Sequence, residues 1–596
     1  MTIDEYEPDD ILYEISRKLA NVNIHNMSLD ADAETIEKST LPTIRYYLYS
    51  HDKAMCLQSV EMLRRYLTQV GGSSESAQDI LALDILPRIN EILTWDEASS
   101  IQFECAWIVT NIAAGSSEQT YALVESGIVD SLLICIRRNN CSPNTRAQIA
   151  WALSNFAGES AQLREMLMEK RAPAVVAEVL KTIHDEIYTQ VYTYSYSYGK
   201  MHITDQEMCT NVKALVWSLA NMSRGGFKTA NYWSVYCPVF EVLEKLIHFD
   251  HNDILTDACW GLSRILYSMH EVPSFYRNVS ISFELCSRLS QLLRRSSIPI
   301  IVPALRAIIN ITSGPDEHSV ILLKSGLLNH IPALMTPDFP AGIRRDAFLL
   351  IGNIAVCGGL LIQKIINNNN LIKCVLAHVR VPGKIYNQET RQWDPTLGYM
   401  YCEIDEEWKI TSEALSIISN IISRGSSSCV REFLKDENEV PATLVHLLRS
   451  QDVPLQPTQK CIDAIINLVE RTNLLSSGSS DQQNNTDQVN TYSLELLNEG
   501  LIPLLEGQYE LHDEDDSIKT RCDVLEGILE EGIETMKKIK AKQNQSKSLA
   551  GMFGMVEARN TLISTNKRRV LHGPEDGDIR LIENAIGNLS VSNGGE

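Results

Sequence analysis

Apolar residues at helical spacing recur in related segments along most of the chain. Three segments contain a tryptophan followed four residues later by an asparagine, at Trp107/Asn111, Trp151/Asn155 and Trp217/Asn221. Related segments end at Arg264, Asn310, Asn353, Asn420 and Asn467, with most steps of about 43–47 residues and two of about 66–67. Shorter helical patterns, often starting just after a glycine, lie between them. The pattern predicts a repeated unit of one long helix and one or two short helices.

The two longer steps contain insertions, near 186–206 and 383–408, which we expect to emerge as surface loops. The repeats occupy residues 51–540, between an acidic segment at 1–50 and a C-terminal tail at 541–596 that we expect to be disordered. No run alternates convincingly enough to predict a sheet. Because one helical unit cannot bury its own apolar face, the units must stack, and the sequence predicts an all-α solenoid.

Each tryptophan and its asparagine share one stripe of their helix, because residues four apart lie about 40° apart around the axis. Ile108, Val109 and Ile112 lie on the opposite side and form the core face. Stacking would align the indoles and amides in rows. An amide can bond to the backbone of an extended peptide, and two neighbouring indoles can hold the stem of a lysine or arginine. A single Trp-x-x-x-Asn is more often a core residue followed by a helix-end polar residue, but three copies at a repeat period favour a peptide-binding surface.

Acidic residues accompany these stripes. Glu104, Asp257, Asp346 and Glu413 stand three residues before the tryptophan position, and Glu159 follows Asn155. The formal net charge of −23 argues against general nucleic-acid binding and suits a basic partner, although solubility alone would also explain it.

Other features exclude several function classes. No apolar run reaches the ~18 residues of a membrane span, and the N-terminus has no signal-peptide pattern, so we expect a soluble intracellular chain. The 14 cysteines form no CxxC pair or zinc-type cluster. There is no phosphate-binding loop, HExxH or GxSxG motif. We therefore expect no enzyme, catalytic residue, metal or cofactor.

At these residues the chain resembles the importin-alpha (karyopherin-alpha) family. The resemblance extends from about Ser59 to Lys537 and is most specific in Ile101–Thr120 and Pro303–Asn310. It implies a right-handed superhelical solenoid of about ten armadillo repeats. It also implies a nuclear-import cargo adaptor of cytoplasm and nucleus that binds basic nuclear-localisation-signal peptides.

The resemblance assigns the family's major peptide site to repeats two to four. The matching positions are Trp107, Asn111, Gly115, Thr120, Gln148, Trp151, Asn155, Glu159, Trp217, Asn221 and Arg224. The family usually has Asp at Glu159, so we expect an altered but retained site. A minor site on repeats six to eight is matched at Arg306, Asn310, Asp346, Asn353, Glu413 and Asn420. Leu349 and Ser416 replace its two tryptophans, so a second basic cluster should bind weakly.

The family's other partners are importin-beta and an export receptor. The first fifty residues lack the family's basic importin-beta-binding helix, so we do not expect the usual coupling to importin-beta. The acidic run at 512–516 resembles the region where the export receptor docks, or is a solvated loop. The basic tail segment at 566–570 is an ordinary basic patch or an occupant of the chain's own groove. The alternative function is an armadillo scaffold or dedicated chaperone that is not coupled to importin-beta.

Overall fold

The computed structural model describes residues 35–69, 74–96, 98–194, 205–225, 230–272, 279–395, 404–477, 490–512 and 514–530. It divides into two compact units. Unit 1 comprises Met1–Gly226 and Asn231–Gly261, and unit 2 comprises Phe227–Ala230 and Leu262–Glu596. Most of the acidic segment at 1–50 and the whole tail at 541–596 lie outside the described residues.

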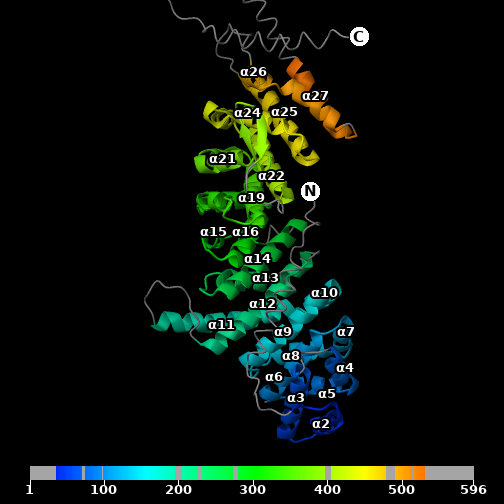
Figure 1. Cartoon of the computed structure of the whole chain (residues 1–596). Coiled ribbons are helices and arrows are strands. Elements are labelled where there is room, and N and C mark those ends of the chain that lie inside the picture. The colour runs from blue at the N-terminus through cyan, green and yellow to red at the C-terminus, as the bar shows by residue number, and fades with distance from the viewer. Residues whose placement is uncertain are drawn as a thin grey trace, which may run out of the picture. The chain divides into compact units, whose positions relative to one another are not determined.

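Unit 1 is a series of helix groups that follow one another along the chain (Figure 1). A short first group, α2 (Leu41–Leu48) and α3 (Lys53–Thr68), begins before residue 51, where the sequence pattern placed the first repeat. The long helices α3, α6, α9 and α12 pack against one another in that order. The further members are α4 (Ser74–Ala82), α5 (Leu86–Leu93), α6 (Ser99–Ala113), α7 (Ser117–Glu125), α8 (Ile128–Ile136), α9 (Pro143–Glu159), α10 (Ala161–Glu169), α11 (Ala172–Tyr194), α12 (Gln206–Met222), η3 (Ala230–Tyr232, in part), α13 (Trp233–Leu246) and the first part of α14 (Asn252–Glu271).

Unit 2 repeats the same arrangement, with α16, α19, α22 and α25 as its successive long helices. Residues 516–530 are also helical. The remaining members are α15 (Phe283–Leu292), α16 (Ile298–Thr312), α17 (Asp316–Lys324), η5 (Leu327–Asn329), α18 (Ile331–Leu334), α19 (Ala341–Val356), α20 (Gly359–Ile366), α21 (Asn369–Ala377), α22 (Ile404–Arg424), α23 (Ser427–Phe433), η7 (Asp436–Asn438), α24 (Val440–Leu448), α25 (Leu455–Ser477), α26 (Thr491–Asn498) and α27 (Leu501–Leu511). The predicted all-α stack of helical repeats is confirmed.

The stripe pattern of the long helices explains how they pack. On α6, Ile108, Val109 and Ile112 have no exposed surface, whereas Trp107 and Asn111 are half-buried. Burying a large aliphatic side chain stabilises the fold by roughly 1.5–3 kcal/mol. The apolar face of each long helix therefore holds the stack together. On α6 the Trp/Asn stripe lies at the border of that face, whereas on α12 Trp217 is half-buried and Asn221 is buried.

One backbone corner recurs between the two helices that follow a long helix. Gly127, Gly326 and Gly500 occupy it with φ values of 80°, 84° and 79°. Left-handed backbone is nearly free for glycine and costs other residues roughly 1–2 kcal/mol. Asp84, Arg171 and Glu439 adopt the same region in other repeats, with φ values of 51°, 59° and 45°. The corner is therefore kept even where no glycine supports it.

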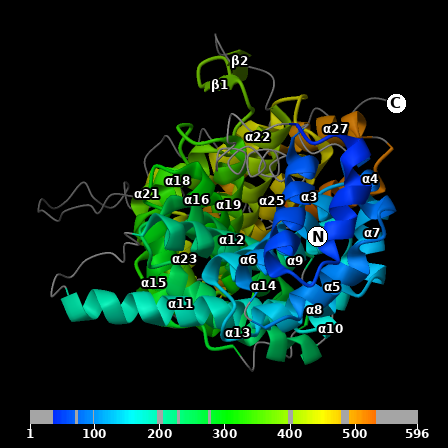
Figure 2. The ribbon, with the colours of Figure 1, turned by 90° about the horizontal axis from the view of Figure 1, so that it is seen from below.

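The two predicted insertions contain more regular structure than loops. Helix α11 continues to Tyr194, into the first insertion, and its end extends past the other helices of unit 1 (Figure 2). In the second insertion, β1 (Lys384–Asn387) pairs antiparallel with β2 (Gln392–Pro395), so the expectation of no sheet was wrong here. Four-residue strands are too short for a clear alternation in the sequence.

The hairpin is anchored to α24 by aromatic contacts. Tyr386 stacks on His446 with ring centroids 3.9 Å apart, and Trp393 Nε1 donates to the His446 carbonyl at 2.8 Å. Lys384 also pairs with Asp452. These contacts fix a segment that extends from the helices of unit 2.

Candidate peptide-binding surface

The predicted major-site residues lie on successive elements of unit 1. Trp107 and Asn111 are on α6, Trp151 and Asn155 on α9, and Trp217 and Asn221 on α12. Since these three helices pack in order, the pairs lie on neighbouring helices, and Trp151 contacts Trp217. The remaining major-site residues lie on or next to the same helices: Gly115 and Thr120 at the corner from α6 into α7, Gln148 and Glu159 on α9, and Arg224 after α12.

The corner after α6 leaves no room for a side chain at Gly115. Ser116 caps α7 by accepting from Gln119 N, and Gln119 Oε1 accepts from Ser116 N at 3.0 Å. A Cβ on Gly115 would lie 2.1 Å from Gln119 Oε1. Thr120 is fully buried and its hydroxyl donates to the Ser116 carbonyl at 3.2 Å, so it supports the corner from inside.

The amides of α9 connect it to α6. Asn155 Nδ2 donates to the Thr110 carbonyl at 3.1 Å, and Gln148 Nε2 donates to Thr110 Oγ1 at 2.8 Å. Asn155 thus uses one donor within the fold. Its carbonyl oxygen and second N–H are the groups that a peptide backbone would meet.

The asparagines of unit 2 bridge neighbouring long helices in the same way. Nδ2 of Asn310 donates to the Ser263 carbonyl at 2.8 Å, and Nδ2 of Asn420 donates to the Gly352 carbonyl at 3.4 Å. Asn353 Nδ2 bonds to Thr312 Oγ1 at 3.3 Å. The asparagine ladder therefore holds repeats together as well as lining a surface.

Asn111 and Asn221 differ from Asn155. The side-chain nitrogen of each is buried and has no hydrogen-bond partner in the described part of the chain. A buried donor without a partner costs roughly 1–3 kcal/mol. These two amides, on the helices either side of α9, therefore have unused hydrogen-bonding capacity.

The indoles do not form an open slot. The rings of Trp151 and Trp217 meet edge to face, with centroids 5.5 Å apart. An alkyl chain between two rings needs contacts of about 3.5–4 Å on both sides, so it would hold them about 7–8 Å apart. The expected slot between this pair is closed, and a lysine stem would part the rings or lie against their outer surface.

Trp107 is also in contact with its own chain. The Arg64 guanidinium lies over its ring, 4.4 Å from the centroid, and Phe103 meets it edge-on at 5.5 Å. Arg64 is on α3, 43 residues before Trp107 and therefore at the tryptophan position of the preceding repeat. Sequence reasoning missed it because the motif was sought within single helices, although the repeat spacing contained the signal.

Three of the predicted acidic residues are already paired with cations. Glu104 is bonded to Arg64. Asp346 lies 3.6 Å from Arg306 Nε and 3.5 Å from Arg345 Nη2, and Glu413 Oε1 lies 3.6 Å from Lys460 Nζ. Burial raises the carboxyl pKa of Glu104 and of Asp346, so each depends on its cation to stay ionised.

Glu159 is different. It is the last residue of α9, and its recorded partner is the Ser117 hydroxyl, with no cation among the described residues. The C-terminus of a helix carries partial negative charge, which disfavours a carboxylate there by roughly 0.3–1 kcal/mol. A cation supplied by another molecule would pair with the Glu159 carboxylate and would offset its unfavourable interaction with the helix C-terminus.

The predicted minor-site residues lie on α16, α19 and α22 of unit 2. Leu349 and Ser416 stand where the resemblance implies tryptophans, and the Ser416 hydroxyl donates to the Ser412 carbonyl at 3.0 Å. With Asp346 and Glu413 both paired, this face has little free negative charge to offer a basic peptide.

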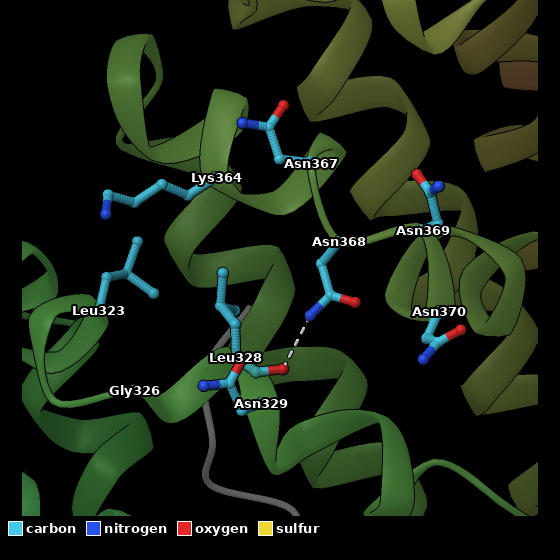
Figure 3. Close-up of a pocket in the computed structure, with 9 residues that line it drawn as sticks. All are labelled: Leu323, Gly326, Leu328, Asn329, Lys364, Asn367, Asn368, Asn369 and Asn370. Carbon is cyan, nitrogen blue, oxygen red and sulfur yellow. Dashed lines mark hydrogen bonds between the residues drawn. The ribbon is translucent and has the colours of Figure 1, made fainter.

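A polar recess of about 460 Å³ lies elsewhere in unit 2, at the corners of two successive repeats (Figure 3). Its lining is rich in asparagine, and Asn368 Nδ2 donates across it to the Leu328 carbonyl at 2.9 Å. None of the predicted site residues lines it.

The part of the chain that the structure describes contains no group of three or more His, Cys, Asp or Glu residues able to hold a metal. Within the same residues no single helix is long and apolar enough to span a membrane. The bent pair α7 and α8 satisfies length and composition only in combination.

No protein-family model matches the chain. It is 26% identical over 307 residues to importin subunit alpha-1b of Oryza sativa subsp. japonica, covering 52% of this chain and 51% of that one. It is 28% identical over 310 residues to importin subunit alpha-3 of Arabidopsis thaliana, covering 52% of each. The chain thus spans about half the length of the curated relatives it matches.

Among solved structures, an engineered protein matches with a TM-score of 0.59 and 17% identity, over 83% of this chain and 99% of that one. A likeness at this identity concerns the fold alone. Taken with the sequence relatives, it shows that the chain is similar to importin-alpha proteins over about half of its length and folds as an all-α stack of helical repeats.

Proposed function

We propose that the chain is a nuclear-import cargo adaptor that binds a basic nuclear-localisation-signal peptide on the face formed by α6, α9 and α12. The observation that carries the proposal is the environment of Glu159. Its carboxylate lies at the C-terminus of α9, the helix that carries half-buried Trp151 and Asn155, and has a neutral partner. A lysine or arginine of a peptide is the complementary group.

The peptide backbone would be held by amides. Asn155 retains its acceptor oxygen. The side-chain nitrogens of Asn111 and Asn221 have no partners among the described residues, but both are buried, so each amide would have to turn outward to donate to a peptide. An extended peptide presents a carbonyl and an N–H at each residue, which matches such a row. Each hydrogen bond would add roughly 0.5–1.5 kcal/mol.

The ion pairs in unit 2 favour a signal peptide with a single basic cluster over one with two clusters. A second basic cluster on α16, α19 and α22 would compete with Arg306, Arg345 and Lys460 for Asp346 and Glu413. Because those carboxylates are already satisfied, a bipartite signal would gain little.

The proposal places the adaptor in cytoplasm and nucleus, with the export receptor as a candidate partner. Importin-beta, whose usual coupling is not expected from the sequence, is a partner to be tested. In the predicted export-receptor region, Asp515 accepts from the backbone nitrogens of Ser517 and Ile518 at 3.0 Å. These bonds lower the pKa of Asp515 and begin the helix at 516–530. This part of the acidic run therefore has a structural role besides any docking role.

A scaffold or dedicated chaperone with a private partner is the second candidate. It is favoured by the contact between Trp151 and Trp217 and by Arg64 over Trp107, since both reduce the aromatic surface offered to a cargo lysine.

The test is fluorescence-anisotropy titration of a labelled lysine-rich peptide with wild type, Glu159→Gln and Glu125→Gln. Glu125 is exposed, ends helix α7 as Glu159 ends α9, and gives the same change in net charge. We expect Glu159→Gln to weaken binding by about tenfold, the loss of one charge-assisted hydrogen bond, and Glu125→Gln to leave it unchanged. Folded wild type that does not bind the peptide would favour the scaffold.

A further inference from the structure

Arg64 occupies a complete cation site formed by α6. Trp107 supplies the aromatic face, 4.4 Å from the guanidinium, and Glu104, one turn earlier on the same helix, supplies the carboxylate. An indole face and a carboxylate on one side of a helix are what a lysine or arginine of a peptide would seek. Here a residue of the preceding repeat fills that position.

The occupant is firmly held. The side chains of Glu104 and Arg64 are only 11% and 21% exposed. Burial of Glu104 penalises its charge, so the ionised carboxylate needs the guanidinium beside it. A peptide cation approaching Trp107 would have to displace Arg64 or accept a like charge at close range.

The next long helix is arranged differently. Trp151 contacts Trp217 instead of a cation, and Glu159 accepts from the Ser117 hydroxyl. The cation-accepting capacity of the face therefore lies at the α9 end, and the α6 end is already neutralised.

We infer that Arg64 is a specificity-determining residue that acts as an internal competitor at the Trp107–Glu104 site, so that the chain selects peptides with a short basic cluster opposite Glu159 and no basic residue opposite Trp107. The inference rests on the proposed peptide binding and names the class of cargo within it. It also makes α3 part of the recognition surface, although no peptide atom need touch Arg64.

The experiment is a lysine scan. A labelled peptide with four consecutive lysines, and its four single lysine-to-alanine forms, are titrated against wild type, Arg64→Gln and Arg64→Gln/Glu104→Gln. The double variant removes the buried charge that Arg64→Gln would leave unpaired, so it tests folding as well as binding. Lys170→Gln is the matched control, because it frees a carboxylate, Asp130 on α8, from a 2.6 Å ion pair with Lys170, the residue that follows α10.

In wild type, we expect binding to depend on the lysine that meets Glu159 and to change little when the lysine nearest Trp107 is replaced. In Arg64→Gln, replacing that second lysine by alanine should weaken binding by about fivefold, because the lysine now makes a cation–π and ion-pair contact with Trp107 and Glu104. The double variant should lose this gain, and Lys170→Gln should behave as wild type.

An unchanged scan in folded Arg64→Gln, with binding still dependent on Glu159, would overturn the inference and leave the proposed function standing. Wild-type binding that already weakens when the lysine nearest Trp107 is replaced by alanine would also overturn the inference and leave the proposed function standing. Absence of binding to every folded form would overturn both.

Discussion

Two carboxylates on neighbouring long helices show how much a residue's role depends on its surroundings. Glu104 on α6 is buried against Arg64, whereas Glu159 ends α9 beside a hydroxyl. The sequence singled out both as acids near a tryptophan. Their different partners come from α3 and α7, and such partners follow only from how the repeats stack.

The Arg64–Glu104 pair also predicts a stability effect. Replacing Arg64 by Gln leaves Glu104 buried without its cation, which should destabilise the fold by roughly 1–3 kcal/mol. The further change Glu104→Gln should recover part of the loss because the unpaired charge is gone. Urea unfolding of the three proteins measures the two effects. A double variant no more stable than Arg64→Gln would contradict the account.

Asp346 gives a pH-dependent prediction. Burial raises its carboxyl pKa above the unfolded value near 3.9, so the native state takes up the proton at a higher pH than the unfolded chain. The residue therefore contributes more stability as pH falls from 7 toward 4, and this contribution is lost as pH rises through the folded pKa. Relative to Asp346→Asn, wild type should gain stability in urea unfolding as pH falls from 7 toward 4. A relative loss would show that Arg306 and Arg345 outweigh burial.

At the scale of elements, the left-handed corner between the two helices that follow a long helix has a testable effect on the free energy of unfolding. No heavy atom lies within 4 Å of a Cβ added at Gly127, so Gly127→Ala would be penalised by backbone conformation alone, by about 1 kcal/mol. Glu439 has φ of 45° at the same corner, and Glu439→Gly should stabilise by about 0.5 kcal/mol. Thermal unfolding checks both variants: the account predicts a lower Tm for Gly127→Ala and a higher Tm for Glu439→Gly. A higher Tm for Gly127→Ala would refute it.

The sequence was most informative about the long helices. Their apolar faces repeat at a fixed period, and period and stripe together predicted which side of α6 and α9 is buried. On α12 the prediction was wrong for Asn221, which is buried. The β-hairpin and helix α2 were missed because each is too short for a periodic signal. The continuation of α11 was missed because its Tyr/Ser-rich sequence suggested a loop.

The site was predicted less completely than the fold. Spacing located the Trp/Asn pairs, but ring contacts and ion pairs between repeats depend on side-chain packing. Arg64, Arg345 and Lys460 were therefore not anticipated, and neither was the contact between Trp151 and Trp217.

At the scale of the whole molecule, the account predicts a difference between two kinds of cargo. Asp346 and Glu413 in unit 2 are paired with cations of the chain, whereas Glu159 in unit 1 has the Ser117 hydroxyl and no cation among the described residues. Adding a second basic cluster to a single-cluster peptide should therefore raise its affinity by less than about threefold, under 0.7 kcal/mol. Anisotropy titration of both peptides at one salt concentration measures this. A gain of tenfold or more would restore the minor site to the mechanism.

The central claim is that a basic peptide lies on α6, α9 and α12. Hydrogen exchange of the full chain, with and without a saturating single-cluster lysine peptide, tests it most directly, because bound backbone and its neighbours exchange more slowly. The account predicts added protection in α6, α9, α12 and the corner at Gly115–Thr120, and unchanged exchange in α16, α19 and α22. Protection confined to α16, α19 and α22 while the peptide is bound would contradict it.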